Sequence, residues 1–261
     1  MERNRDGYTS PLSTRYASKE MQYLFSDNNK FRTWRKLWIA LAKAEHQLGL
    51  NVTREQIDQL EAHAGDINYD VAEAREKLVR HDVMSHVYAY GQQCPDAEAI
   101  IHLGATSCYV GDNTDILILR DAARLTLRKC AQTLRNLAAF AERYKSLPCL
   151  AYTHLQPAQL TTVGKRATLW MNELVMDVEN LEFQVRQLRL RGAKGTTGTQ
   201  ASFMELFEGD EEKVRKLEAL VAEQMGFEKC VAVSGQTYSR KADAYVLAAL
   251  SGVAQSACKF A

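Results

Sequence analysis

The sequence predicts an all-α fold, in which a small helical N-terminal domain is followed by part of a bundle of long helices. Two observations support this prediction. Only four prolines interrupt the 261 residues, and apolar residues recur every three or four positions through most of the chain, which is the spacing of a helix face. Alternating runs of β-branched residues, which would indicate strands, are scarce.

The first part of the chain predicts helices of moderate length. We expect them at residues 27–48, 53–64 and 69–92. Thr53 followed by Gln56 is a capping-box pattern, which marks the start of the second of these helices. The composition shifts toward Gly, Ser and Thr around residues 104–113. We therefore place a domain boundary there and divide the chain into residues 1–106 and 107–261.

Two longer apolar stripes follow this boundary. The first predicts a helix that starts at Asp112, ends before Pro148 and is about 50 Å long. The second predicts a helix that opens at Pro157, because proline is favoured at the first helical position, and that runs to Gly192. Two long helices with a short connection favour an antiparallel pair in a bundle.

Composition excludes several classes of partner. The formal net charge is +1, which gives no electrostatic reason to expect nucleic acid or an anionic membrane. The six cysteines are widely spaced, as is usual for reduced thiols in a cytosolic protein. The longest uncharged run, at 244–258, is too short to cross a bilayer. We expect a cytoplasmic protein with no nucleic-acid or membrane partner.

Two polar segments of the first domain carry chemical groups. Arg15 offers a fork of donors suited to phosphate, and Tyr16 adds a hydroxyl. A solvated N-terminal arm is the alternative interpretation. In the second segment, at 80–86, Asp82 and His86 lie one helical turn apart and could orient each other. An ordinary charged helix face is the alternative there, and the two histidines of this segment are too little for a metal site.

Two further polar segments precede the long helices. Thr106, Ser107 and the backbone N–H groups of a helix start favour an anion site, although Asp112 or Asn113 would also make a plain N-cap. His154 lies just before the next predicted helix and could act as a general acid or base near neutral pH. A helix-capping or packed histidine is an equal alternative.

Two glycine-containing loops, at 192–200 and 234–237, look like phosphate cradles. The first fails the Walker pattern, because no Gly-Lys-Ser/Thr follows at the required spacing. As isolated loops, both are more often flexible connections. No metal-binding or dinucleotide-binding pattern occurs, so we expect neither a metal nor a cofactor.

The order and spacing of these segments resemble the fumarase/aspartase superfamily. Residues 80–82, 102–115, 194–203 and 235–238 are similar to the adenylosuccinate lyases, of the animal type, and the resemblance extends over residues 8–261. It implies a fumarase/aspartase-like fold and the β-elimination of fumarate from adenylosuccinate, giving AMP, or from the succinyl-carboxamide intermediate of purine synthesis. It also implies a nucleotide substrate, no cofactor, and a homotetramer whose active sites each draw on three subunits.

The resemblance further implies roles for individual residues. His154 matches the general acid of the family, and His81 matches a histidine that supports catalysis. The remaining matches are contacts to the phosphate, the nucleotide and the succinyl carboxylates. The residues that match substrate contacts are Arg15, Tyr16, Arg80, His81, Asp82, Thr106, Ser107, Thr153 and Gln236.

One catalytic element of the family is missing from the sequence. Its general base is a serine on a loop that reads Ser-Ser-x-Met-Pro-x-Lys-x-Asn-Pro, and the 261 residues contain no such segment. The last predicted helix, at 238–261, also stops without a helix-ending signal. We therefore expect a truncated chain that is inactive alone. Two alternatives remain: a sibling lyase acting on argininosuccinate, fumarate or aspartate, and a non-catalytic helical protein or truncated subunit that impairs full-length partners.

Overall fold

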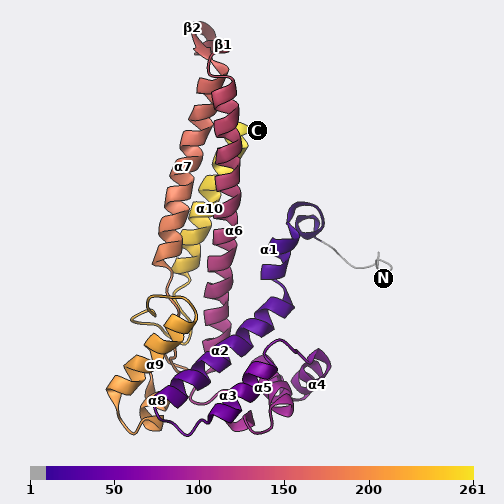
Figure 1. The fold of residues 1–261 in the computed structure, drawn as a ribbon, viewed down its shortest axis with the longest axis vertical. Coiled ribbons are helices and arrows are strands. Elements are labelled where there is room, and N and C mark those ends of the chain that lie inside the picture. The colour runs from indigo at the N-terminus through magenta and orange to yellow at the C-terminus, as the bar shows by residue number, and fades with distance from the viewer. Residues whose placement is uncertain (1–9) are drawn as a thin grey trace. The chain divides into compact units, whose positions relative to one another are not determined.

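A computed structural model describes residues 10–261 and confirms a mostly helical fold (Figure 1). These residues form two compact units. The first unit comprises the described residues up to Ile118 together with Arg189–Ser239, and the second comprises Leu119–Leu188 together with Arg240–Ala261. The division at residue 106 is a prediction about family domains and stays one. No helix within residues 10–261 is long and apolar enough to cross a membrane.

The first unit is built around helix α2. Its buried face includes Trp34, Leu37, Trp38 and Leu41, each at most 2% exposed, and it packs against α3 and α9. The helical elements that lie wholly in this unit are η1 Leu12–Tyr16, α1 Lys19–Leu24, α2 Asp27–Gln47, α3 Arg54–Ala62, α4 Tyr69–Val79, α5 Asp82–Gln93, η2 Glu98–Ile100, α8 Ala201–Leu206 and α9 Glu211–Gln224.

The capping-box prediction is confirmed, and the prediction of one helix over 69–92 is wrong. Thr53 and Gln56 cap α3 reciprocally. Residues 69–92 instead form α4 and α5, which are separated by Arg80 in the left-handed conformation, with φ +53°, and by His81 in an extended conformation. Sequence periodicity missed the break because the apolar spacing continues through it.

Helix α6, Ser107–Arg143, begins earlier than predicted. Asp112 and Asn113 are therefore not N-caps: both lie inside the helix and are buried, at 4% and 0% exposure. Their side chains bind backbone groups of distant loops instead of the helix start. The first turns of α6 belong to the first unit, and its remainder belongs to the second.

A β-hairpin occupies the place where a helix was predicted to open at Pro157. Strand β1, Pro148–Thr153, pairs antiparallel with β2, Gln156–Thr162. The helix α7, Val163–Gln187, starts only after this strand. The Thr162 hydroxyl accepts a hydrogen bond from the backbone N–H of Lys165 at 3.1 Å, so threonine, not proline, caps the helix.

The second unit contains the remainder of α6, α7 and α10, which spans Lys241–Phe260. A Cβ on Gly164 would lie 2.3 Å from the Ala141 carbonyl oxygen, so the start of α7 packs against the end of α6. The two helices are thus antiparallel, as predicted (Figure 1). The Trp170 and Phe260 rings meet edge to face, with centroids 4.8 Å apart, between α7 and α10.

Candidate active site

His81 and Ser107, two of the predicted site residues, contact each other in the first unit. His81 caps α5, and its Nδ1 accepts a hydrogen bond from the backbone N–H of Met84 at 3.3 Å. A ring nitrogen that accepts a hydrogen bond carries no proton, so this contact corresponds to the tautomer with its proton on Nε2. That atom lies 3.2 Å from the Ser107 hydroxyl oxygen. The contact joins the start of α5 to the start of α6.

The start of α6 has the chemistry of an anion site. Thr106 precedes the helix and is buried, with its carbonyl oxygen accepting from the Tyr109 N–H at 2.8 Å. Ser107 is the first helical residue, so its hydroxyl lies at the positive end of the helix dipole. The imidazole N–H of His81 adds a donor. This arrangement suits a carboxylate.

Arg80 and Asp82 flank this histidine. Arg80 ends α4, and its backbone N–H donates to the Glu76 carbonyl at 2.7 Å. The Asp82 carboxylate accepts from the Val83 N–H at 2.7 Å, with one oxygen 3.9 Å from Nδ1 of His81. The helix break thus presents a guanidinium, an imidazole and a carboxylate at consecutive positions.

The predicted orientation of His86 by Asp82 is not found. Between residues 10 and 261 these two side chains share no hydrogen bond or ion pair. His86 instead stacks on Phe31 with ring centroids 3.8 Å apart. Burial, aided by the charge of Arg35, lowers the pKa of His86 to about 4. This histidine is a neutral part of the core.

A second, half-buried histidine lies near His81. The Trp38 indole N–H donates to Nδ1 of His102 at 2.9 Å. Burial, followed by the neighbouring His81, lowers the pKa of His102 to about 4. His102 therefore stays neutral at physiological pH and supports the segment that precedes α6.

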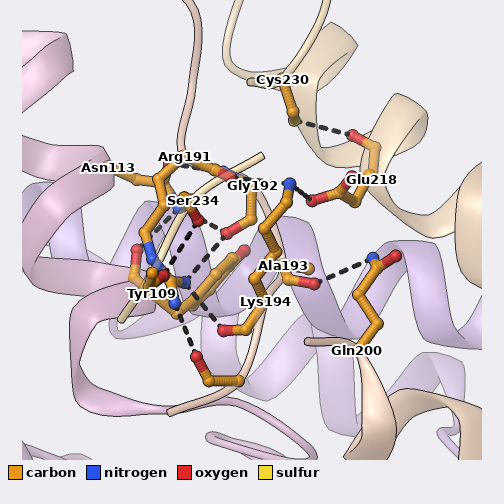
Figure 2. A network of polar contacts seen from close by, with 12 residues as sticks. Tyr109, Asn113, Arg191, Gly192, Ala193, Lys194, Gln200, Glu218, Cys230 and Ser234 are labelled. Carbon is orange, nitrogen blue, oxygen red and sulfur yellow. Dashed lines mark hydrogen bonds and ion pairs between the residues drawn. The ribbon is translucent and has the colours of Figure 1, made fainter. Parts of the chain in front are cut away.

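The two glycine-containing loops are joined by a buried arginine (Figure 2). Arg191 is fully buried. Its Nε donates to the Gln236 carbonyl at 2.6 Å, and its terminal nitrogens donate to the carbonyls of Lys194 and Gly195, each at 2.8 Å. One guanidinium thus holds the backbone of both loops.

Helix α6 anchors the same loops. The Asn113 carboxamide accepts from the Gly192 N–H at 3.0 Å and donates to the Gly192 carbonyl at 3.3 Å. The same carboxamide also donates to the carbonyl of Tyr109, which lies one turn earlier in α6, at 2.8 Å. Asp112 accepts from the Tyr238 N–H at 2.7 Å. The helix that begins with Ser107 therefore also positions residues 192–200 and 234–238.

Lys194 does not serve as a free cation of a phosphate cradle. It is 4% exposed and forms an ion pair with Glu218, while its ammonium also donates to the Arg191 carbonyl at 3.0 Å. Burial raises the pKa of Glu218, and the hydrogen bond from Lys194 opposes that shift. The ion pair between Lys194 and Glu218 therefore fixes this loop on its buried side.

Arg15 and Tyr16 lie in the short helix η1. The guanidinium carbon of Arg15 lies 5.6 Å from the centre of the Tyr16 ring, a cation–π contact. Tyr16 is 71% exposed. Their role in binding phosphate stays a prediction.

Thr153 and His154 belong to the second unit, whereas the other predicted site residues belong to the first. Thr153 pairs with Gln156 at the end of the hairpin. His154 and Leu155 form its turn with φ +50° and +60°, the values of a type I′ turn. Positive φ is strained for residues with a Cβ, so an exposed histidine is held in an unfavourable backbone conformation at a predicted functional position.

Sequence reasoning missed Asn113 as a loop anchor and Arg191 altogether. The stretch 188–193 holds two arginines, Arg189 and Arg191, among apolar residues. Such a pattern suggests that an arginine is buried with partners, but it does not single out Arg191. The binding partners are distant in the sequence: Gln236 lies 45 residues from Arg191, and Gly192 lies 79 residues from Asn113.

Comparison with protein families decides the classification. A family model described as "Lyase" matches residues 15–261. The chain belongs to this lyase family. The match includes both the His81–Ser107 contact and the hairpin that carries His154.

Several relatives of this lyase chain share much of its sequence. The adenylosuccinate lyase of Saccharomyces cerevisiae is 54% identical over 98% of this chain and 54% of its own length. That of Schizosaccharomyces pombe is 51% identical over 97% of this chain and 53% of its own length. The chain therefore spans about half the length of the curated relatives it matches.

Solved structures confirm the fold of this lyase chain. A fumarate lyase from Mesorhizobium sp. BNC1 matches with a TM-score of 0.80 and 23% identity, covering 94% of this chain and 56% of that one. A 3-carboxy-cis,cis-muconate lactonizing enzyme from Pseudomonas putida matches with a TM-score of 0.80 and 24% identity, covering 95% and 56%. At these identities the likeness concerns the fold alone.

Proposed function

We propose that this chain is part of an adenylosuccinate lyase, which releases fumarate from adenylosuccinate to give AMP and from the succinyl-carboxamide intermediate of purine synthesis. The observation that carries the proposal is the His81–Ser107 contact at the start of α6, in a chain that is 54% identical to the Saccharomyces enzyme. A carboxylate-binding helix start fits a succinyl group.

The proposed reaction is a β-elimination. A base removes a proton from the succinyl Cβ, the carbon next to the one bonded to nitrogen. The resulting carbanion is stabilised by the carboxylate attached to Cβ. Its electron pair then forms the C=C bond of fumarate while the C–N bond breaks, and an acid protonates the leaving nitrogen. We assign the acid to His154 and the base to the serine loop that the resemblance implies.

The other residues bind the substrate in this proposal. Thr106, Ser107 and His81 hold the succinyl carboxylates, where donors stabilise the charge that develops in the transition state. Thr153 contacts the substrate beside His154. The nucleotide and its phosphate are contacted by Arg15, Tyr16, Arg80, Asp82 and Gln236.

We further propose that the complete enzyme is a cytoplasmic homotetramer. Each active site then combines segments from three subunits. The support is the resemblance together with the long helices α6, α7 and α10, whose apolar faces suit assembly into a larger bundle. Exposed apolar side chains on α7, such as Met176 at 61% and Leu169 at 53%, agree with this.

A chimaera tests the proposed function. It joins residues 1–261 to the remaining part of the Saccharomyces relative, so that both halves of the enzyme are present. We expect it to convert adenylosuccinate to AMP, followed by ultraviolet absorbance, and to leave argininosuccinate and aspartate unchanged. The separate 261-residue chain and the separate yeast segment should each be inactive.

Two results would contradict the proposal. A folded, assembled chimaera that cleaves argininosuccinate but not adenylosuccinate would make the protein a sibling lyase. Fumarate release by the 261-residue chain alone would show that the missing base loop is not needed. A separate experiment mixes this chain with native yeast subunits and measures their lyase activity. Loss of activity would show that the chain acts as a subunit that impairs its partners.

A further inference from the structure

The two glycine-containing loops of the first unit form a single body. Besides the carbonyls of Gln236, Lys194 and Gly195, the Arg191 guanidinium reaches the Gly192 carbonyl at 3.5 Å. Its four acceptors come from residues 192–195 on one side and from residue 236 on the other. A guanidinium can serve acceptors in several fixed directions at once, whereas an ammonium is a compact point donor.

Direct backbone packing joins the loops as well. Gly198 has φ +82°, and a Cβ built on it would lie 1.8 Å from the Ser234 carbonyl oxygen. Only glycine allows this approach. The loops therefore touch at two places: through the guanidinium at their buried base and through Gly198 nearer the surface.

Several polar side chains of these two loops are exposed to solvent and are therefore available to a ligand. Gln236 is exposed although its carbonyl is held by Arg191. Thr196, Thr197 and Thr199 are exposed too. These threonine and glutamine side chains thus face solvent, while Arg191 binds the backbone of both loops from the buried side. Such an arrangement suits a preformed binding surface.

We infer that Arg191 is a positioning residue, which fixes the backbone of Gln236 and of residues 194–199 so that their side chains meet the nucleotide substrate as one preformed surface. This inference rests on the proposed function, because it names a new supporting residue for the same site. Arg191 itself touches no substrate. It acts through Gln236, whose main chain it holds.

The test uses Arg191→Lys in the chimaera. Lysine keeps the charge but cannot reproduce the forked donors, so the loops should loosen. We expect the KM for adenylosuccinate to rise about tenfold, roughly the effect of losing one charge-assisted hydrogen bond, while kcat changes less than about threefold. Hydrogen–deuterium exchange of residues 234–238 should become about tenfold faster.

A double-mutant cycle separates positioning from mere stability. If Arg191 acts through Gln236, then Arg191→Lys should raise KM by less than about twofold when Gln236→Ala is already present. An equal rise of KM in both backgrounds overturns the inference. So does unchanged exchange at residues 234–238 in Arg191→Lys.

Arg35 supplies the matched control. It is also buried, at 2% exposure, and donates to the carbonyls of His63 and Asp66 and to the Gln93 side chain. Arg35→Lys should lower the thermal midpoint but leave both KM and exchange at residues 234–238 unchanged. A rise of KM in Arg35→Lys as large as that in Arg191→Lys would reduce the effect to general destabilisation and overturn the inference.

Gly198→Ala covers the case in which Arg191→Lys fails to fold. The added methyl group forces the loops apart at the half-buried end, so KM and exchange should rise as above; unchanged values overturn the inference. If the parent chimaera is inactive on adenylosuccinate, the proposed function fails, while the exchange measurements still decide whether Arg191 fixes these loops.

Discussion

The loops around Arg191 and the hairpin that carries His154 present their functional candidates in opposite ways. The loops have a buried guanidinium, a buried carboxamide and an ion pair beneath their exposed side chains. The hairpin is a two-stranded ribbon whose residues 153–160 are exposed. Two-stranded hairpins are marginally stable by themselves.

This difference teaches where each candidate obtains its orientation. Gln236 and Ser107 are fixed by groups of the chain itself, so their geometry is present without any further component. Within residues 10–261, His154 is held only by the strand pairing and by a turn with positive φ at two non-glycine residues. Its orientation in a working site therefore needs contacts that the hairpin does not supply, which agrees with the proposal that an assembled site combines several subunits.

Replacing His154 gives the largest expected effect and tests the hairpin side of the comparison. In the chimaera, His154→Ala should lower kcat by about 10²–10⁴-fold, the usual contribution of a general acid or base. Steady-state kinetics with adenylosuccinate measure it. Leu155→Ala, in the same turn and 99% exposed, is the control and should keep nearly full turnover. Near-normal kcat in His154→Ala would remove this residue from the acid role.

Replacing Asn113 tests the other side. Asn113→Ala leaves the Gly192 N–H and carbonyl without their partner in a buried place, so the loops should open more easily by about 2–3 kcal/mol. Hydrogen–deuterium exchange over residues 192–200 measures this opening. Asn136→Ala, at an exposed position of α6, should change it by less than about 0.5 kcal/mol. Equal effects of the two changes would mean that Asn113 does not anchor the loop.

The contrast also explains what the sequence could predict. Helix α2 and the Thr53 cap follow from local spacing and local side chain–backbone bonds, and both were predicted. The helical class follows from the same periodicity. The family resemblance brought His81 and Ser107 forward as site residues from two separate segments, and the structure joins them.

The missed features depend on contacts that local patterns do not contain. Apolar spacing runs through Arg80 and through Pro157, so it hid both the break between α4 and α5 and the hairpin before α7. A proline at 157 is acceptable in a short exposed strand as well as at a helix start. Asn113 and Arg191 bind loops that are far away in the sequence, so their roles required the fold.

A buried carboxyl in α2, that of Glu45, should make the stability of the first unit depend on pH. Glu45 is fully buried, neither of its carboxyl oxygens has a hydrogen-bond partner among the described residues, and burial raises its pKa from 4.5 to about 9. Its influence reaches Tyr109 in the first turn of α6: burial raises the pKa of Tyr109, and the charge of Glu45 raises it further. The folded state therefore binds a proton that the unfolded state releases above pH 4.5.

The sign of the pH dependence follows from this difference. The stability contributed by protonated Glu45 is fully present below the unfolded pKa of 4.5 and is lost as pH rises through about 9. Between pH 6 and 7 the free energy of unfolding should fall by roughly 1 kcal/mol because of this group. Glu45→Gln should flatten that slope, measured as the urea midpoint of tryptophan fluorescence in the chimaera, whereas Glu179→Gln at an exposed position should leave it unchanged. An unaltered slope in Glu45→Gln would mean that protonation of Glu45 does not contribute to the stability of the first unit. The comparison with the hairpin would then depend only on the loop contacts of Asn113 and Arg191.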